Sequence, residues 1–251
     1  MDTVTKISIV IPLRVDSQER SDNLNFILSL LLQMPFVDVD ILEADVEQRF
    51  HLLHHDERIR YGFVEDSDPV FHRTRYLNRL LLAARHPVAG IWDTDVIIPS
   101  AQLTAAVEQI HVGSAMSFPY DGRFIFLNEK ESLAVHEDVS ALEKMKIFYG
   151  GRPSVGGAFL VNRDKYLQAG GENERFYGWG PEDAERVKRL EILELPISRV
   201  EGPLFHLYHP RGMNSDFDYG ERDKRNLQAL LDTCRMTKTE LLKKISSWRK
   251  G

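Results

Sequence analysis

Two carboxylates stand two residues apart in the segment Asp93-Thr94-Asp95, between the apolar runs 89–92 and 96–99. A turn at the end of a strand can aim both side chains at one hard cation, which also takes the oxygens of a diphosphate. Such a cation neutralises the charge that develops on a leaving nucleoside diphosphate. Pairs of this kind also occur in solvated turns, but carboxylates between apolar runs are costly without a cationic partner. Asp93 and Asp95 are therefore candidate metal and donor ligands.

His206 and His209 are candidate ligands for the same cation. In a straight strand, residues three apart point to opposite faces, so both histidines reach one ion only if the segment turns. Pro210 biases His209 towards an extended conformation, which makes His209 the stronger single candidate. The alternative is a pair of ordinary core or surface histidines.

An aromatic and acidic segment, residues 176–183, contains Tyr177, Trp179, Glu182 and Asp183. Aromatic faces suit the apolar face of a sugar ring. The two acids follow a proline, as in the first turn of a helix, where they would favour the helix dipole. The functional alternative is that one of them is the base that deprotonates an acceptor hydroxyl.

Glycines and arginines supply further candidates. Gly156-Gly157 precedes an apolar run and either lines a sugar pocket or forms a turn. Arg14, Arg73 and Arg75 are candidate contacts for a diphosphate or a base, with surface salt bridges as the alternative.

Strand-like runs alternate with helical runs through the first half of the sequence, which favours an α/β fold with an open, mostly parallel sheet flanked by helices. In such sheets, ligands bind outside the carboxyl ends of the strands, here at residues 12–14 and 93–95. The second half is more irregular and ends in helices. The predicted strands are 6–12, 38–44, 58–64, 88–92 and 115–118, and the predicted helices are 22–34, 74–84, 100–110, 128–148, 218–231 and 238–248.

Length and composition indicate one soluble globular domain, residues 1–251, because 251 residues with 43% hydrophobic content can bury a sizeable core. The net charge of -6 argues against a nucleic-acid partner. The single cysteine, Cys234, excludes an intramolecular disulfide and suits a cytoplasmic location. We find no signal peptide or transmembrane run. Membrane contact would then be peripheral, for example through a lipid-linked acceptor.

Several of these segments, in one order, resemble the β-1,4-galactosyltransferase family and bacterial capsule and chondroitin-polymerase-type glycosyltransferases. The opening strand I-V-I-P-L-R is similar to the family's I-I-P-F-R, and F-H-R-T-R-Y-L-N to F-N-R-A-K-L-L-N. W-D-T-D-V-I-I-P is similar to S-D-V-D-L-I-P. The glycine pair followed by G-W-G-P-E-D is similar to G-G followed by G-W-G-G-E-D-D-D. I-S-R at residues 197–199 and the histidine segment follow in the family's order, so the resemblance covers roughly residues 6–212.

The resemblance implies a GT-A fold, a Mn²⁺ (or Mg²⁺) cofactor, a UDP-sugar donor, a glycan acceptor and inversion at the anomeric carbon. Asp95 matches the family's metal-binding acid and His209 its metal histidine, while His206 stands where the family has a methionine ligand. Asp183 matches the proposed catalytic base and Glu182 its acceptor-binding neighbour.

Other roles follow in the same way. Trp179 matches an aromatic wall shared by donor and acceptor, and Tyr177 is a second candidate for acceptor binding. We expect residues 1–118 to bind the nucleotide sugar, 119–217 to form the acceptor and catalytic half, and 218–251 to form terminal helices. The donor-binding candidates are Pro12, Arg14, Glu43, Arg73, Asp93, Asp95, Gly156, Gly157 and Trp179.

The sequence also departs from the family. Pro181 replaces a glycine, Ala184 replaces the third acid and His72 replaces an asparagine, so galactose is not implied. The family's Golgi anchor and cysteines are missing, which points to a bacterial cytoplasmic enzyme making capsule or another surface polysaccharide. The polar segment 211–218 follows the metal histidine and is a candidate lid over bound donor.

Two other functions stay open at this point. A nucleotidyltransferase that makes sugar nucleotides is also α/β with metal-binding acids, but it should carry a glycine-rich phosphate loop, and residues 14–19 contain no glycine. A non-catalytic module that binds a sugar or nucleotide would need neither the acid pair nor the histidines.

Overall fold

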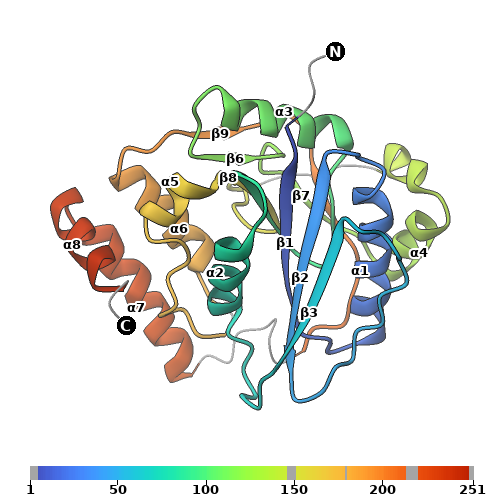
Figure 1. Ribbon diagram of the computed structural model, residues 1–251, viewed down its shortest axis with the longest axis horizontal. Helices are drawn as coiled ribbons and strands as arrows, with labels where there is room; N and C mark the ends of the chain where they lie inside the picture. The colour runs from blue at the N-terminus through green and yellow to red at the C-terminus, as the bar shows by residue number, and fades with distance from the viewer. Residues whose placement is uncertain (1–4, 146–150, 179, 213–219, 249–251) are drawn as a thin grey trace.

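The computed structural model describes residues 5–145, 151–178, 180–212 and 220–248. Its centre is a seven-stranded sheet in the order β3-β2-β1-β4-β8-β6-β9 (Figure 1). The first four strands in this order run parallel, β8 is antiparallel to both neighbours, and β6 is parallel to β9. The predicted mostly parallel α/β sheet is thus confirmed. Its strands are β1 (Ile7–Leu13), β2 (Val37–Asp45), β3 (Ile59–Glu65), β4 (Val88–Trp92), β6 (Met116–Phe118), β8 (Ala158–Asn162) and β9 (Ile197–Arg199).

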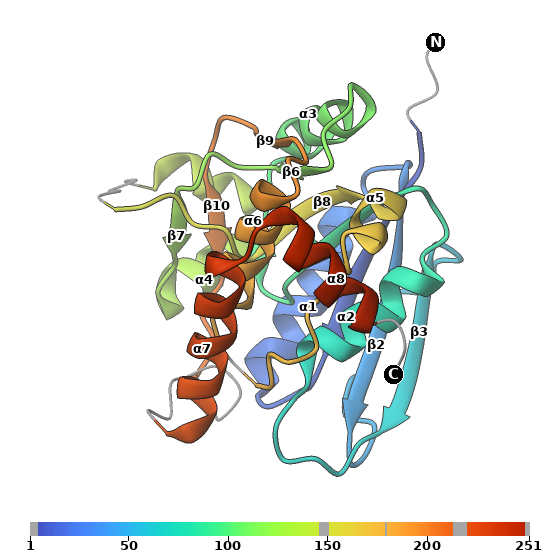
Figure 2. The same cartoon turned by 90° about the vertical axis from the view of Figure 1, so that its left-hand side faces the viewer.

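Helices flank this sheet and shield its central strands, so that β1 and β4 are buried along their whole length. Parallel strands with both faces covered are mostly apolar, and Ser8 is the one polar residue in these two strands. Helix α2 packs on β1 and β2, α3 packs on β6 and β8, and α6 packs on α7 and α8, which lie in front in Figure 2. Among the described residues, no helix is both long and apolar enough to cross a bilayer. The helices are α1 (Gln18–Leu31), α2 (Arg73–Ala83), α3 (Ser100–His111), α4 (Glu129–Glu137), α5 (Arg163–Gln168), α6 (Glu182–Ile192), α7 (Glu221–Arg235) and α8 (Lys238–Trp248).

A second, three-stranded sheet joins distant parts of the chain. Its order is β5 (Val96–Ile97), β10 (Leu204–His206), β7 (Phe124–Phe126). Strand β10 runs antiparallel to β5 and parallel to β7, which places His206 opposite Val96. The pairing therefore brings the histidine segment beside the acids that follow β4.

Three predicted helices differ from the structure. The helix expected over 22–34 is α1, which begins at Gln18 and ends at Leu31, so both of its ends were placed three to four residues too late. The single helix expected over 128–148 was wrong, because α4 ends at Glu137 and a short 3-10 helix, η1 (Val139–Lys144), follows. Asp138 separates them with an extended backbone (φ -150°), and its side chain accepts from Ser140 N, which starts the second turn. The helix expected over 218–231 runs from Glu221 to Arg235, so its end was placed four residues too early.

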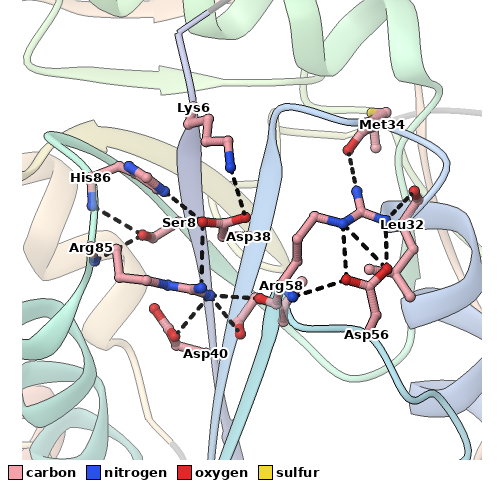
Figure 3. Close-up of polar contacts among 11 residues, drawn as sticks. Lys6, Ser8, Leu32, Met34, Asp38, Asp40, Asp56, Arg58, Arg85 and His86 are labelled. Carbon is pink, nitrogen blue, oxygen red and sulfur yellow. Dashed lines mark hydrogen bonds and ion pairs between the residues drawn. The ribbon is translucent and has the colours of Figure 1, made fainter.

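A polar network lies at the amino ends of β1 and β2 (Figure 3). Asp38 and Asp40 alternate along β2, so their side chains point to the same face. His86 Nε2 lies 2.7 Å from Asp38 Oδ2, and Arg85 reaches both carboxylates, at 3.4 Å and 3.2 Å. Both aspartates are nearly fully buried. The network ties the turn between α2 and β4 to β2, and hence fixes β4, whose other end carries Asp93.

We predict that Asp38→Ala lowers the free energy of unfolding by about 2–4 kcal/mol, because it leaves His86 without its buried partner and Arg85 with only one of its two carboxylates, that of Asp40. The cost stays below that of breaking a fully buried pair, since both partners keep some contact with water. Urea unfolding measures the effect. Asp164→Ala, which removes an exposed carboxylate beside Arg163, is the matched control and should unfold like the unmutated protein. An unchanged midpoint for Asp38→Ala would show that the network contributes nothing.

Candidate active site

The turn that carries the two acids is fixed from both sides. Asp93 follows β4 directly, and its backbone N donates to Gly157 O at 2.9 Å. Asp95 precedes β5, and its carbonyl accepts from Leu207 N at 2.8 Å. The turn is therefore held to β8 on one side and to the histidine segment on the other.

Asp95, His206 and His209 come together at this turn. His206 Nε2 lies 3.3 Å from Asp95 Oδ1, and His209 Nε2 lies 3.2 Å from Asp95 Oδ2. Strand β10 ends at His206, so the chain turns before His209 and both rings reach one carboxylate. One ligand atom from each of the three residues lies within 4.8 Å of the other two, an arrangement that could hold a metal ion.

The protonation of the group also suits a cation. Burial would raise the pKa of Asp95, but the charges of His206, Arg20 and His209 outweigh it and lower that pKa. Burial lowers the pKa of His206, while the charge of Asp95 opposes this shift. His209 Nδ1 lies 2.8 Å from Pro210 O and 3.3 Å from Arg20 Nη2, so it has both an acceptor and a donor beside it. Its Nε2 faces Asp95 Oδ2, the orientation in which both residues could hold one cation.

A second cluster of acids adjoins the first. Arg73 Nη2 lies 2.5 Å from Asp93 Oδ1, and Arg186 Nη1 lies 2.6 Å from Asp183 Oδ1. Burial raises the pKa of Asp93, and the charges of Asp95 and Asp183 add to this rise while Arg73 opposes it. Asp93 thus interacts electrostatically with Asp95, which belongs to the triad of Asp95, His206 and His209, and with Asp183 of α6.

Glu182 is the most unusual acid of the site. Its side chain is 8% exposed, and its Oε2 has no hydrogen-bond partner among the described residues. Burial, together with the charge of Asp183, raises the pKa of Glu182 to about 8. Glu182 therefore holds a proton at neutral pH and can donate a hydrogen bond, whereas Asp183, paired with Arg186, can accept one.

Gly156 fits closely against Asp183. A Cβ at Gly156 would lie 2.6 Å from Asp183 Oδ2, so a larger residue would displace the carboxylate. The carbonyl of Gly156 accepts from Tyr120 Oη at 2.6 Å. At Gly157 the backbone has φ +82°, a conformation that favours glycine. The glycine pair therefore lies directly against Asp183, where a side chain would collide with the carboxylate.

Other predicted donor residues lie at the carboxyl ends of the strands but are engaged in structural contacts. Arg14 donates to Ala44 O and Asp68 O and pairs with Asp66. Glu43 is fully buried and accepts from the backbone of Arg49 and Phe50 and from Tyr61 Oη. Pro12 is buried in β1 and Arg75 is exposed. Donor binding by these residues stays a prediction.

The acceptor candidates are only partly described. Tyr177 Oη donates to Asp68, and the backbone of Tyr177 is held by the side chain of Asn226. Trp179 lies outside the described residues, as does most of the candidate lid, of which only Arg211 and Gly212 are described.

Sequence reasoning missed two arginines of the site. Arg20, in the first turn of α1, contacts Asp95 at 3.1 Å, and Arg186 holds Asp183 and Glu172. Each carried a signal. A cation in the first turn of a helix opposes the helix dipole, and Arg186 stands three residues after the candidate base, which puts both on one helix face.

Residues 138–210, which include β8, α6 and the histidine segment, match the family described as the N-terminal domain of galactosyltransferase. The resemblance expected from the motifs is confirmed. The fold is similar to that of a β-1,4-galactosyltransferase 7 from Drosophila, at 17% identity, with a TM-score of 0.51 over 93% of this chain and 81% of that one. The chain is a glycosyltransferase with a GT-A fold.

A second solved structure supports the fold assignment for this glycosyltransferase. Glucosyl-3-phosphoglycerate synthase from Mycobacterium tuberculosis is 14% identical, with a TM-score of 0.53 over 92% of this chain and 80% of that one. At these identities the two structures establish the fold alone. No curated protein matches the chain.

The raised pKa of Glu182 predicts a pH-dependent stability. The pKa of a glutamate in the unfolded chain is about 4.5, whereas that of folded Glu182 is about 8. Between these values the unfolded chain binds fewer protons than the folded one, so stability falls as pH rises and the loss is complete above the folded pKa. Glu182→Gln removes this penalty. We expect the variant to be more stable than the unmutated protein by about 3–5 kcal/mol at pH 8.5 and by less than about 1 kcal/mol at pH 5, since each pKa unit corresponds to about 1.4 kcal/mol.

Urea unfolding at the two pH values checks this expectation. Glu201→Gln, in an exposed turn, is the control and should change stability equally at both pH values. A Glu182→Gln effect that is the same at pH 5 and pH 8.5 would mean that Glu182 is ionised throughout.

Proposed function

We propose that this glycosyltransferase moves a sugar from a UDP-sugar to a carbohydrate acceptor, with inversion and with a divalent cation at Asp95, His206 and His209. The observation that carries the proposal is the convergence of these three residues beside the acids of α6. The similar solved structures add support. The Drosophila enzyme was solved as a complex with manganese, UDP-Gal and xylobiose, and the mycobacterial synthase with Mn²⁺, UDP-glucose and phosphoglyceric acid.

The donor set fits the proposed cation. One carboxylate and two imidazoles favour a transition-metal ion such as Mn²⁺ over Mg²⁺, which prefers oxygen ligands. When bound, the cation would supply positive charge to the diphosphate leaving group. The remaining donor contacts that we propose are Pro12, Arg14, Glu43, Arg73, Asp93, Gly156, Gly157 and Trp179.

Asp183 is the proposed base. Its carboxylate takes the proton of the acceptor hydroxyl as that oxygen bonds to the anomeric carbon, while the bond from this carbon to the phosphate oxygen breaks. Arg186 fixes one carboxylate oxygen at 2.6 Å, and the side chain of Asp183 is 33% exposed. One displacement of this kind inverts the anomeric configuration.

Glu182 and two aromatic residues are proposed to position the acceptor. The protonated carboxyl of Glu182 offers a hydrogen-bond donor beside the carboxylate of Asp183. Trp179 and Tyr177 would offer flat apolar surface for a sugar ring. Together these contacts would hold the hydroxyl near its base, which is the larger part of catalysis in a two-substrate reaction.

The biological setting is a further part of the proposal. We propose a cytoplasmic enzyme that extends capsule or another bacterial surface polysaccharide, with peripheral access to a lipid-linked acceptor. The support for this setting is the resemblance of the motifs to bacterial capsule polymerases. Incubation with defined oligosaccharides from such polymers tests the acceptor class.

We predict that one donor in a panel of UDP- and GDP-sugars releases its nucleotide in the presence of Mn²⁺ and acceptor. Chelator should abolish the release, and Asp95→Ala should reduce it by about 100-fold or more, since a bound metal contributes several kcal/mol of charge stabilisation. Asp164→Ala, far from the triad, should release nucleotide like the unmutated protein. UDP binding that is indifferent to both metal and Asp95→Ala would instead favour a non-catalytic binding module.

We predict that Asp183→Asn lowers kcat by a factor of about 10²–10⁴, the usual contribution of a general base, with UDP-sugar affinity retained. Glu191→Gln, an exposed acid on the same helix, is the matched control. Steady-state kinetics measure the rates, and NMR of the first product gives its anomeric configuration. Full transfer by Asp183→Asn would exclude this residue as the base, and a retained configuration would exclude the single displacement.

A further inference from the structure

Arg20 occupies the same carboxylate as the candidate metal ion. Its Nη1 donates to Asp95 Oδ2 at 3.1 Å and to Thr94 Oγ1 at 3.0 Å, and its Nε donates to Asp16 Oδ1 at 2.8 Å. Its Nη2 lies 3.3 Å from His209 Nδ1. The side chain of Arg20 is only 15% exposed. A fixed guanidinium is therefore packed against two of the three residues that could hold a metal.

The place of Arg20 in the sequence is unfavourable for its own helix. Ser17 caps α1 by accepting from Arg20 N, so Arg20 lies in the first turn, where the helix dipole repels a cation. A residue that destabilises its own helix is expected to have a role elsewhere in the structure. Here the compensation comes from the carboxylates of Asp16 and Asp95, both outside the helix.

The charged side chains paired closest to the triad carry less negative charge than a divalent cation carries positive charge. The carboxylates of Asp16, Asp93 and Asp95 face the guanidiniums of Arg20 and Arg73, which leaves one excess negative charge. A divalent cation between Asp95 and the histidines reverses this to one excess positive charge. It would also lie within a few ångströms of Arg20 in a site with little water to screen the repulsion.

A phosphate anion removes this conflict. A diphosphate has oxygens for the metal ion and for the planar fork of a guanidinium, whose geometry matches a phosphate group. Arg20 can release Asp95 to the metal and turn its Nη atoms to the phosphate, while Asp16 still holds its Nε. Metal ion and anion then stabilise each other at one place.

We propose that Arg20 couples the two ligands: its charge makes cation binding at Asp95, His206 and His209 weak until a diphosphate is present. This inference rests on the proposed function and adds to it a positioning residue that sets the dependence of metal on nucleotide. By linkage, the metal must strengthen nucleotide binding by the same factor.

The test is Mn²⁺ affinity, measured from the EPR signal of free Mn²⁺ with and without saturating UDP. In the unmutated protein we expect UDP to strengthen Mn²⁺ binding by about tenfold or more, within the usual range of coupling between ligands. In Arg20→Gln we expect Mn²⁺ alone to bind more tightly, by about threefold or more, and the effect of UDP to shrink correspondingly. Arg20→Lys keeps the charge and should keep weak binding of Mn²⁺ alone.

Arg60→Gln is the control, because Arg60 also pairs with a buried aspartate, Asp40, but at the other end of the sheet. It should leave both affinities unchanged. Weaker binding of Mn²⁺ alone by folded Arg20→Gln would overturn the inference, since Arg20 would then only hold Asp95 in place. An unaltered effect of UDP in that variant would overturn it as well. Absence of both Mn²⁺ and UDP binding from the unmutated protein is a different result, which would overturn the proposed function itself.

Discussion

The buried carboxylate of Asp95 is the constraint on which the site depends. It is 2% exposed, and an ionised acid in such a place is tolerated only with positive or hydrogen-bonding partners around it. Those partners come from three separate parts of the chain. Arg20 comes from α1, Thr94 from the turn itself, and His206 and His209 from the end of β10 and the residues that follow it. Folding of the second half is therefore needed to complete a charge balance that begins in the first half.

Helix α6 supplies a second fixed platform. Arg186 is almost fully buried and bridges Glu172 and Asp183, and Arg189 pairs with Glu185 one turn further on. Buried ion pairs contribute little net stability, but removal of one partner is costly, so they specify a single arrangement. The guanidinium of Arg186 also lies 4.3 Å from the ring of Phe159 on β8. The proposed base is thereby fixed to the central sheet rather than to a surface loop.

Much of the fold was readable from the sequence, because buried parallel strands and their helices leave strong periodic signals. The strand over Val88–Trp92 was predicted to the residue, and the alternation of elements gave the sheet. The small sheet gave no such signal, since β5, β7 and β10 have only two or three residues each. Short pairings of this kind are decided by tertiary contacts, and propensity does not reveal them.

The site was predictable as a set of residue types and less so as a geometry. The sequence did not decide whether both histidines could bind one ion, because that depended on whether the strand ends at His206. Arg20 stood out only as a cation in the first turn of a helix, and its partner Asp95 could not be predicted because it lies far along the chain. Charge compensation across the fold does not follow a sequence period, and it requires the packed structure to be seen.

The connection between the two acid clusters follows from one antiparallel strand. Strand β8 pairs with β4 in the reverse direction, so its beginning lies beside the end of β4. This direction brings Gly157 O against Asp93 N and sets Gly156 next to Asp183. If β8 ran parallel to β4, its first residues would lie beside the start of β4, at the other end of the strands. The reversal of β8 is thus what lets residues from the two halves of the chain face each other across a single site.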